Sequence, residues 1–294
     1  MKILIAVRSK EYSSPTLDVG MNISRYLRAS TTIVDVGEKV SEISSKDIKL
    51  ANEIMDSWDL DRPGIDVLEW AYDYLVDNKF IDQQDEGEVF PKNLLVHHGE
   101  RRAELLLKGS VVKNLRLILR NGDIVDELRD EVQTYQYDVT IIGDSGRRKM
   151  VLEIVRYIDS SIFLINNFTP KKIYKILLAV DDSPGTRKAL RYGVRIAKAF
   201  GIDVTLLTIS KNKKFGEVQK KASKHAETMM RRSGISAKII METGDPVKTI
   251  IKTAGQDHII IMGESRRSPL KKLFLGSKPL NVMKLSQTPV LIVK

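Results

Sequence analysis

Short apolar runs alternate with amphipathic stretches throughout the C-terminal part of the chain. The runs 175–180, 203–209, 237–242, 258–263 and 289–293 are rich in β-branched residues and short enough for the strands of a parallel sheet. The stretches between them, 184–200, 214–232, 246–255 and 278–286, carry apolar residues at helical spacing. Five strands that alternate with four helices predict an α/β fold with a doubly wound parallel sheet.

The loop after the fourth predicted strand combines several features of an anion site. Gly263 opens this basic loop, and Gly276-Ser277 precedes the last predicted helix, with Ser277 as its expected N-cap. Free backbone N–H groups and the positive end of a helix would meet at this point, which favours phosphate. An ordinary strand-to-helix connection with a capped helix would explain the same residues.

The chain also repeats itself. Gly122-Asp123 and the later Gly143 parallel Gly244-Asp245 and Gly263, and the flanking strands match as well. Lys2–Val7 resembles Lys175–Val180 at the start of each copy, and both copies end in a short apolar run. We therefore expect two copies of one domain, at residues 1–168 and 169–294, each with a five-stranded doubly wound sheet.

Residues near 57–99 of the first copy have no counterpart in the second copy. Val67, Trp70 and Tyr74 in this segment fit a helical stripe. An extra pair of helices packed on the first domain is the expected structure, and an insert that docks a partner is the alternative.

The composition narrows the class of protein. The 294 residues include no cysteine and no run of eighteen apolar residues, and the N-terminus leads directly into a strand, so we expect neither a membrane span nor a signal peptide. Residues 171–294 contain 26 Lys and Arg against 9 Asp and Glu, whereas residues 1–170 contain 22 against 29. A cytoplasmic protein is expected, with a basic half that suits phosphates, nucleic acid or an acidic partner.

Four motifs in the second copy carry a resemblance to a known family. They are Val180-Asp181-Asp182-Ser183, Gly244-Asp245-Pro246, Met262-Gly263 and Gly276-Ser277. Residues 172–294 resemble the universal stress protein family, whose nucleotide-binding members carry a glycine, two residues, a second glycine, nine residues, and then glycine with serine or threonine. Gly263, position 266, Gly276 and Ser277 keep this spacing.

The resemblance implies a Rossmann-like fold of the adenine-nucleotide α-hydrolase type and a role in the stress response. It implies ATP or AMP as ligand, with or without Mg²⁺. Asp181 would face the base and ribose, and Ala179, Val180 and Ile209 would line the adenine. Gly263, Gly276, Ser277 and the Lys278 amide would hold the phosphates, and Met262 and Arg266 belong to the same predicted site.

Two departures from the family pattern affect this expectation. Arg266 stands where the pattern has its second glycine, so its side chain either obstructs the phosphates or contacts them in place of the backbone. In the first copy, Arg8 takes the place of Asp181 and the Gly-Ser helix start is missing. We therefore expect the first copy to bind no nucleotide and to serve as a structural or partner-binding domain.

No residue is placed to activate a water molecule, so slow ATP hydrolysis is the most that the sequence allows, and we expect no catalytic residue and no metal site. A nucleic-acid or acidic-partner binding protein that uses the basic half is the alternative, and a protein that acts only in assembly is a third. The final strands, 162–165 and 290–293, would leave apolar edges exposed unless they pair. We expect them to pair antiparallel within one chain as a pseudo-dimer, which would leave further homodimerisation open.

Overall fold

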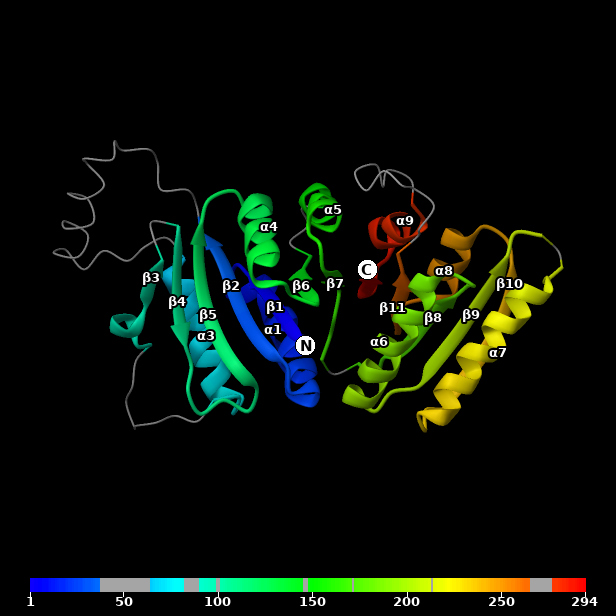
Figure 1. The fold of residues 1–294 in the computed structure, drawn as a ribbon, viewed down its shortest axis with the longest axis horizontal. Coiled ribbons are helices and arrows are strands. Elements are labelled where there is room, and N and C mark those ends of the chain that lie inside the picture. The colour runs from blue at the N-terminus through cyan, green and yellow to red at the C-terminus, as the bar shows by residue number, and fades with distance from the viewer. Residues whose placement is uncertain are drawn as a thin grey trace.

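The computed structural model describes residues 1–37, 64–81, 90–98, 101–144, 148–170, 172–212, 214–264 and 277–294. Two predicted site residues, Arg266 and Gly276, lie outside these ranges, as do several parts of the segment near 57–99. The described residues form one twelve-stranded sheet that runs through the whole molecule, with helices on both of its faces (Figure 1).

The elements follow one another in an alternating order. The N-terminal part contains β1 (Lys2–Val7), α1 (Lys10–Leu27), β2 (Ser30–Gly37), α3 (Ile65–Asp77), the 3₁₀ turn η1 (Lys92–Leu94), β3 (Val96–His98), β4 (Arg102–Leu106), β5 (Lys113–Asn121), α4 (Ile124–Tyr135), β6 (Val139–Gly143), α5 (Arg148–Tyr157) and β7 (Ser161–Ile165). The C-terminal part contains β8 (Lys175–Val180), α6 (Pro184–Phe200), β9 (Val204–Ser210), α7 (Glu217–Arg232), β10 (Ala237–Thr243), α8 (Pro246–Ala254), β11 (His258–Gly263), α9 (Lys278–Leu285) and β12 (Val290–Val293).

The strand order is β10-β9-β8-β11-β12-β7-β6-β1-β2-β5-β4-β3. Read outward from the centre, each side of the sheet has its fifth, fourth, first, second and third parallel strand in turn. The doubly wound topology and the internal repeat that the sequence predicts are thus both present, on either side of β7 and β12. The N-terminal side continues further, because β4 and β3 add to it in antiparallel pairing.

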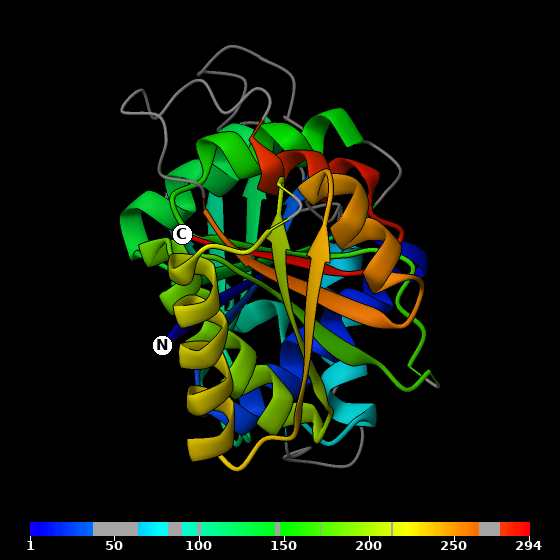
Figure 2. The ribbon, with the colours of Figure 1, turned by 90° about the vertical axis from the view of Figure 1, so that its right-hand side faces the viewer.

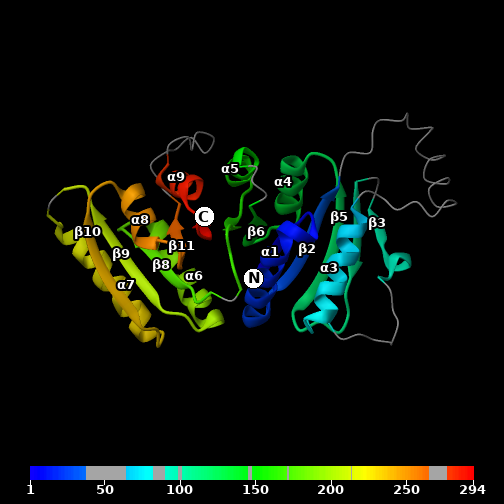
Figure 3. The same ribbon diagram turned by 180° about the vertical axis from the view of Figure 1, so that it is seen from behind.

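Two apolar layers hold the helices onto the sheet. Successive strand residues alternate between them: Leu178 belongs to the layer beneath α6 and α7, and Leu177 to the layer beneath α8 and α9. Both residues are fully buried, as expected for a parallel strand covered on both faces. Seen from behind, α1 and α3 lie on the same side of the sheet as α6 and α7 (Figure 3).

The two parts join through their last strands. β7 and β12 are antiparallel, with Leu164 opposite Val290, Phe163 opposite Leu291 and Ile162 opposite Ile292. The expected pairing of the two final strands within one chain is therefore confirmed. It covers two apolar edges that would otherwise be exposed.

The structure describes only parts of the segment that has no counterpart in the second copy. Its described residues contain one α-helix, α3, on which Trp70 and Tyr74 lie partly buried against the core. Strand β3 then pairs with β4, so this segment also widens the sheet. The sequence expectation did not include these two strands.

Candidate functional site

The carboxyl end of β8 carries an acidic turn that begins α6. Asp181 accepts a hydrogen bond from the Ser183 backbone N–H at 3.0 Å and another from the Thr186 hydroxyl. Ser183 is the N-cap of α6, and its hydroxyl accepts from the Thr186 N–H at 3.2 Å. The sequence thus builds a helix start that also fixes the direction of one carboxylate.

The Asp181 carboxylate is held in its charged form. Partial burial opposes ionisation, but the bonds from Ser183 and Thr186 and the positive charge of Lys278 together lower the pKa of Asp181 below its ordinary value. Lys278 is the first residue of α9, so its charge acts on Asp181 from across the end of the sheet. Two predicted site residues from distant parts of the chain therefore lie within electrostatic reach of each other.

A small apolar surface, which we call the ledge, lies beside this turn. Ala179 and Ile209, at the ends of β8 and β9, are partly buried on the face of the sheet covered by α8 and α9, as is Val247 of α8. Val180 is buried on the opposite face, so only its backbone can line the same space. Ala179 and Ile209 therefore share one face of the sheet with Val247, which the sequence analysis did not name.

Gly263, at the end of β11, is packed against the start of α6. A Cβ atom built on Gly263 would lie 2.2 Å from the carbonyl carbon of Gly185, and one built on Gly185 would lie 2.6 Å from the Glu264 carbonyl oxygen. Neither position has room for a side chain because backbone meets backbone there. Gly185 is a second residue that the sequence reasoning missed, and close packing is a sufficient reason for glycine at 263.

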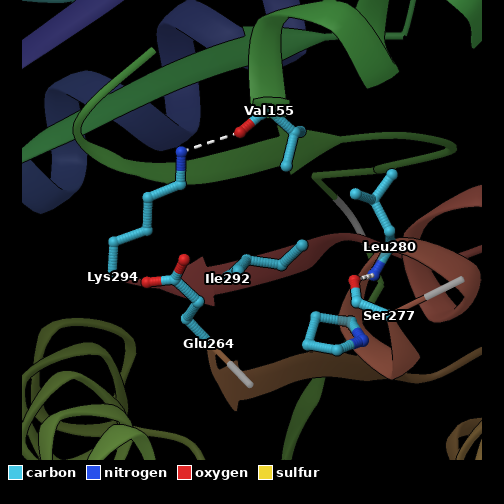
Figure 4. Close-up of a pocket in the computed structure, with 7 residues that line it drawn as sticks. Val155, Glu264, Ser277, Leu280, Ile292 and Lys294 are labelled. Atoms are coloured by element: carbon cyan, nitrogen blue, oxygen red, sulfur yellow. Dashed lines mark hydrogen bonds between the residues drawn. The ribbon is translucent and has the colours of Figure 1, made fainter. Parts of the chain in front are cut away.

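The start of α9 closes the site on the other side. The Ser277 hydroxyl accepts a hydrogen bond from the Leu280 N–H at 3.4 Å, as expected for the N-cap. A small pocket lies beside this cap and is lined by Ser277, Leu280, Ile292, Glu264 and Lys294 among others (Figure 4). Met262 is buried in the layer beneath α9 and can contribute only its backbone to a ligand.

The N-terminal part has the same turn after its first strand, but with a cation in place of the carboxylate. The backbone N–H of Arg8 donates to the Ser13 hydroxyl at 2.9 Å, just as the N–H of Asp181 donates to the Thr186 hydroxyl at 3.2 Å. Arg8 therefore occupies the place of Asp181. In addition, α5 begins at Arg148, five positions after Gly143, whereas α9 begins fifteen positions after Gly263.

A buried ion network lies near the end of β5 in the N-terminal part. Glu131 is fully buried and accepts hydrogen bonds from Arg102 Nε at 3.1 Å, Arg120 Nη1 at 2.6 Å and the Tyr137 hydroxyl at 3.1 Å. Arg120 also donates to Glu127 at 2.7 Å. This network joins α4, the helix that corresponds to α8 in the other part, to strands β4 and β5.

A doubly wound sheet with an acidic turn after its first strand, an apolar ledge and a capped helix start defines a class of α/β protein that binds ligands at the carboxyl ends of its strands. Residues 172–294 match the model of the universal stress protein family. These residues therefore form a domain of that family. No helix among the described residues has the length and apolar character needed to cross a membrane.

Three known proteins illustrate the relationship. The universal stress protein YxiE of Bacillus subtilis is 28% identical over 145 residues, which is 41% of this chain and 98% of that protein. The structure of a universal stress protein from Archaeoglobus fulgidus aligns with 100% of this chain over 96% of its own length. The TM-score is 0.59 and the sequence identity is 14%, so the two share the fold. A universal stress protein in complex with cAMP covers 42% of this chain and 98% of its own, at 22% identity and a TM-score of 0.37.

Proposed function

We propose that residues 169–294 form a domain that binds an adenine nucleotide, ATP or AMP, and that residues 1–168 form a domain that does not. The observation that carries this proposal is the placement of Asp181 and Lys278 at one end of the sheet, close enough for the charge of Lys278 to lower the pKa of Asp181. An ionised carboxylate can accept hydrogen bonds from ribose hydroxyls, and a capped helix start favours phosphates.

The ledge between these groups suits a flat apolar base. Ala179, Ile209 and Val247 leave part of their surface open on the α8 side of the sheet. A base stacked there would place its ribose beside Asp181 and its phosphates toward Ser277. Family membership supports the same assignment, since the spacing of Gly263, Gly276 and Ser277 is that of nucleotide-binding members.

The proposal that the first domain binds no nucleotide is supported by two features of that domain. Arg8 replaces the carboxylate, and the early start of α5 leaves little chain for a phosphate loop. Each of these two features removes one element that the second domain offers to a nucleotide.

Titration calorimetry on the full chain with ATP, ADP and AMP tests the proposal. Asp181→Ala should weaken the binding of nucleotide about tenfold or more, because a charge-assisted hydrogen bond is lost. Asp203→Ala is the matched control, since it removes the same charge at the opposite end of the sheet, just before β9. If the wild-type chain gives no heat with any of the three nucleotides, the proposal fails.

Arg266 decides how the phosphates are held, although it lies outside the described residues. Weaker ATP binding by Arg266→Gly would indicate a direct contact between the guanidinium and a phosphate. Tighter binding would show that the side chain obstructs the site.

A second candidate function rests on the exposed cations of α7. Lys220, Lys221, Lys224, Arg231 and Arg232 are all exposed on this helix. Such a surface suits nucleic acid or an acidic protein, with affinity that falls as salt rises. A melting scan with duplex DNA beside ATP separates the two candidates, because each ligand stabilises only a protein that binds it.

A further inference from the structure

Strand β10 forms one end of the twelve-stranded sheet and is an open edge. Within the described part of the chain it pairs only with β9, and its side chains Ile239 and Met241 are 40% and 38% exposed. Figure 2 looks onto this edge, where β9 and β10 run side by side in the same direction. The opposite end of the sheet, β3, has only three residues. Among the described strands, β10 is therefore the long edge that remains open to another strand.

The hydrogen-bonding groups of β10 that are free for a partner can be identified from those bound to β9. The Ser236 carbonyl accepts from the Val204 N–H at 3.3 Å, and the Gly244 N–H donates to the Ser210 carbonyl at 2.9 Å. Since N–H and C=O of one strand residue point to the same side and alternate along the strand, the even-numbered residues face β9. The odd-numbered residues from 237 to 243 direct their backbone groups outward.

The sequence of this edge is complementary to itself. In an antiparallel pair of two β10 strands centred on Ile240, Lys238 lies opposite Glu242 and Ile239 lies opposite Met241, each twice. The pairs that exchange backbone hydrogen bonds are then 237 with 243 and 239 with 241, which are the residues whose groups point outward. Lys238 and Glu242 fall at the alternate positions, where strands approach more closely and side chains interact best.

The two faces of the strand separate the charged pairs from the apolar ones. Ala237 packs on the side of α7, so Ile239 and Met241 lie on that side as well. Ile240 packs on the side of α8, and Lys238 and Glu242 flank it there. Pairing would cover exposed Ile239 and Met241 on one face and join opposite charges on the other.

Neighbouring registers lose this complementarity. A shift that keeps the backbone pattern places Lys238 opposite either Ile240 or Gly244, and leaves Glu242 without its partner. Lys238 and Glu242 form no ion pair with other residues in the described ranges, so both are available. A single lysine on an edge would only discourage association, whereas Lys and Glu placed symmetrically about Ile240 favour one partner.

We propose that β10 is the interface through which two copies of this chain associate, with the two β10 strands antiparallel and centred on Ile240. The partner is a second copy, because the edge supplies both halves of each charge pair. The sheets of the two molecules become continuous through this contact. It leaves the nucleotide site proposed above on each copy unchanged.

Sedimentation velocity across a concentration series tests the proposal with four proteins. The wild type is expected to dimerise, and Lys238→Glu and Glu242→Lys should each raise the dissociation constant about tenfold or more, because each places like charges opposite one another twice. The double variant Lys238→Glu with Glu242→Lys restores both pairs and should dimerise like the wild type. Lys198 is an exposed residue of α6, and the control variant Lys198→Glu should leave the dimer intact.

A backbone variant gives an independent readout. Ile239→Pro removes an N–H that points away from β9, so it should abolish the dimer while circular dichroism shows a folded monomer. A wild type that stays monomeric at every concentration overturns the proposal. This holds even if β10 of that monomer binds an extended peptide of another protein. A dimer that neither charge reversal weakens, or a double variant that fails to restore it, overturns it equally.

Discussion

The ammonium group of Lys294 donates a hydrogen bond to the backbone carbonyl of Val155 at 2.7 Å, and a second one to the carbonyl of Ile158. The last residue of the chain thereby caps the C-terminal end of α5 in the N-terminal part (Figure 4). A cation at the negative end of a helix is favourable there. This contact adds a charged clamp to the strand pairing between β7 and β12.

Burial lowers the pKa of Lys294, and this desolvation opposes the gain from its hydrogen bonds to Val155 and Ile158. Lys294→Met should therefore lower the free energy of unfolding by only about 1 kcal/mol. Urea titration followed by tryptophan fluorescence measures the change. Lys198→Met is the matched control. Because Lys198 is exposed on α6, this change should leave the free energy of unfolding nearly unchanged. An unchanged midpoint for Lys294→Met would show that the clamp contributes nothing.

Ser277→Ala should remove the N-cap of α9 and destabilise the protein by about 1 kcal/mol, and it should also weaken nucleotide binding. Asp123→Ala removes the N-cap of α4, where the carboxylate accepts from the Val125 N–H at 3.0 Å. This control should lose similar stability without loss of nucleotide affinity. Calorimetry and thermal melts on both variants separate the cap from the ligand contact, and equal affinity losses in both would contradict a role of Ser277 in binding.

Asp35 should make stability depend on pH. Burial, together with the nearby charge of Asp66, raises the pKa of Asp35 to about 7, although the Val36 backbone and Arg8 act in the opposite direction. Between about pH 4 and pH 7 the folded state keeps this proton while the unfolded state has lost it, so the contribution to stability falls as pH rises through this window. Asp35→Asn removes that component.

The measurement is the difference in unfolding free energy between Asp35→Asn and the wild type at pH 5 and pH 8. The asparagine variant should gain relative to the wild type at the higher pH. Asp203→Asn, an exposed aspartate before β9, is the control. A difference that stays constant across the window would show that the folded and unfolded states ionise Asp35 alike.

Glu131→Ala should destabilise the protein by about 3–5 kcal/mol, because it leaves the buried guanidinium groups of Arg102 and Arg120 without their shared partner. Glu227→Ala is the control, because Glu227 is exposed on α7, and it should leave the stability nearly unchanged. Chemical denaturation gives both values. A loss below about 1 kcal/mol for Glu131→Ala would mean that the remaining carboxylates, Glu104 and Glu127, compensate for it.

The parallel strands could be predicted because burial on both faces leaves a continuous apolar run, as in 175–180 and 258–263. Strands β3 and β4 carry no such signal. Val96–His98 is exposed throughout, and β4 begins with Arg102, which is buried against Glu131 of α4, a residue distant in the sequence. A sequence pattern cannot show that a charged residue is buried when its partner lies on another element.

The candidate site was predictable to a similar degree. Asp181 and Ser277 occupy strand-end and helix-start positions that have local sequence signals, and the structure places them at such positions. In the sequence, Gly185 is only a residue of low helix propensity within a predicted helix. No neighbouring residue indicates that the backbone of Glu264 will lie against it. Val247 was missed for the same reason, since its part in the ledge arises only when α8 packs beside β9.

The contact between Gly185 and Gly263 also determines how the site can respond mechanically. With no side chain between the two backbones, there is no compressible layer to absorb a displacement. A shift at Gly263, where the loop toward Ser277 begins, must push directly on the first turn of α6 and so on the hydrogen bonds that orient Asp181. We therefore expect the acidic turn and Gly263 to move as one rigid unit, so that a displacement of either one reaches the other through the protein backbone.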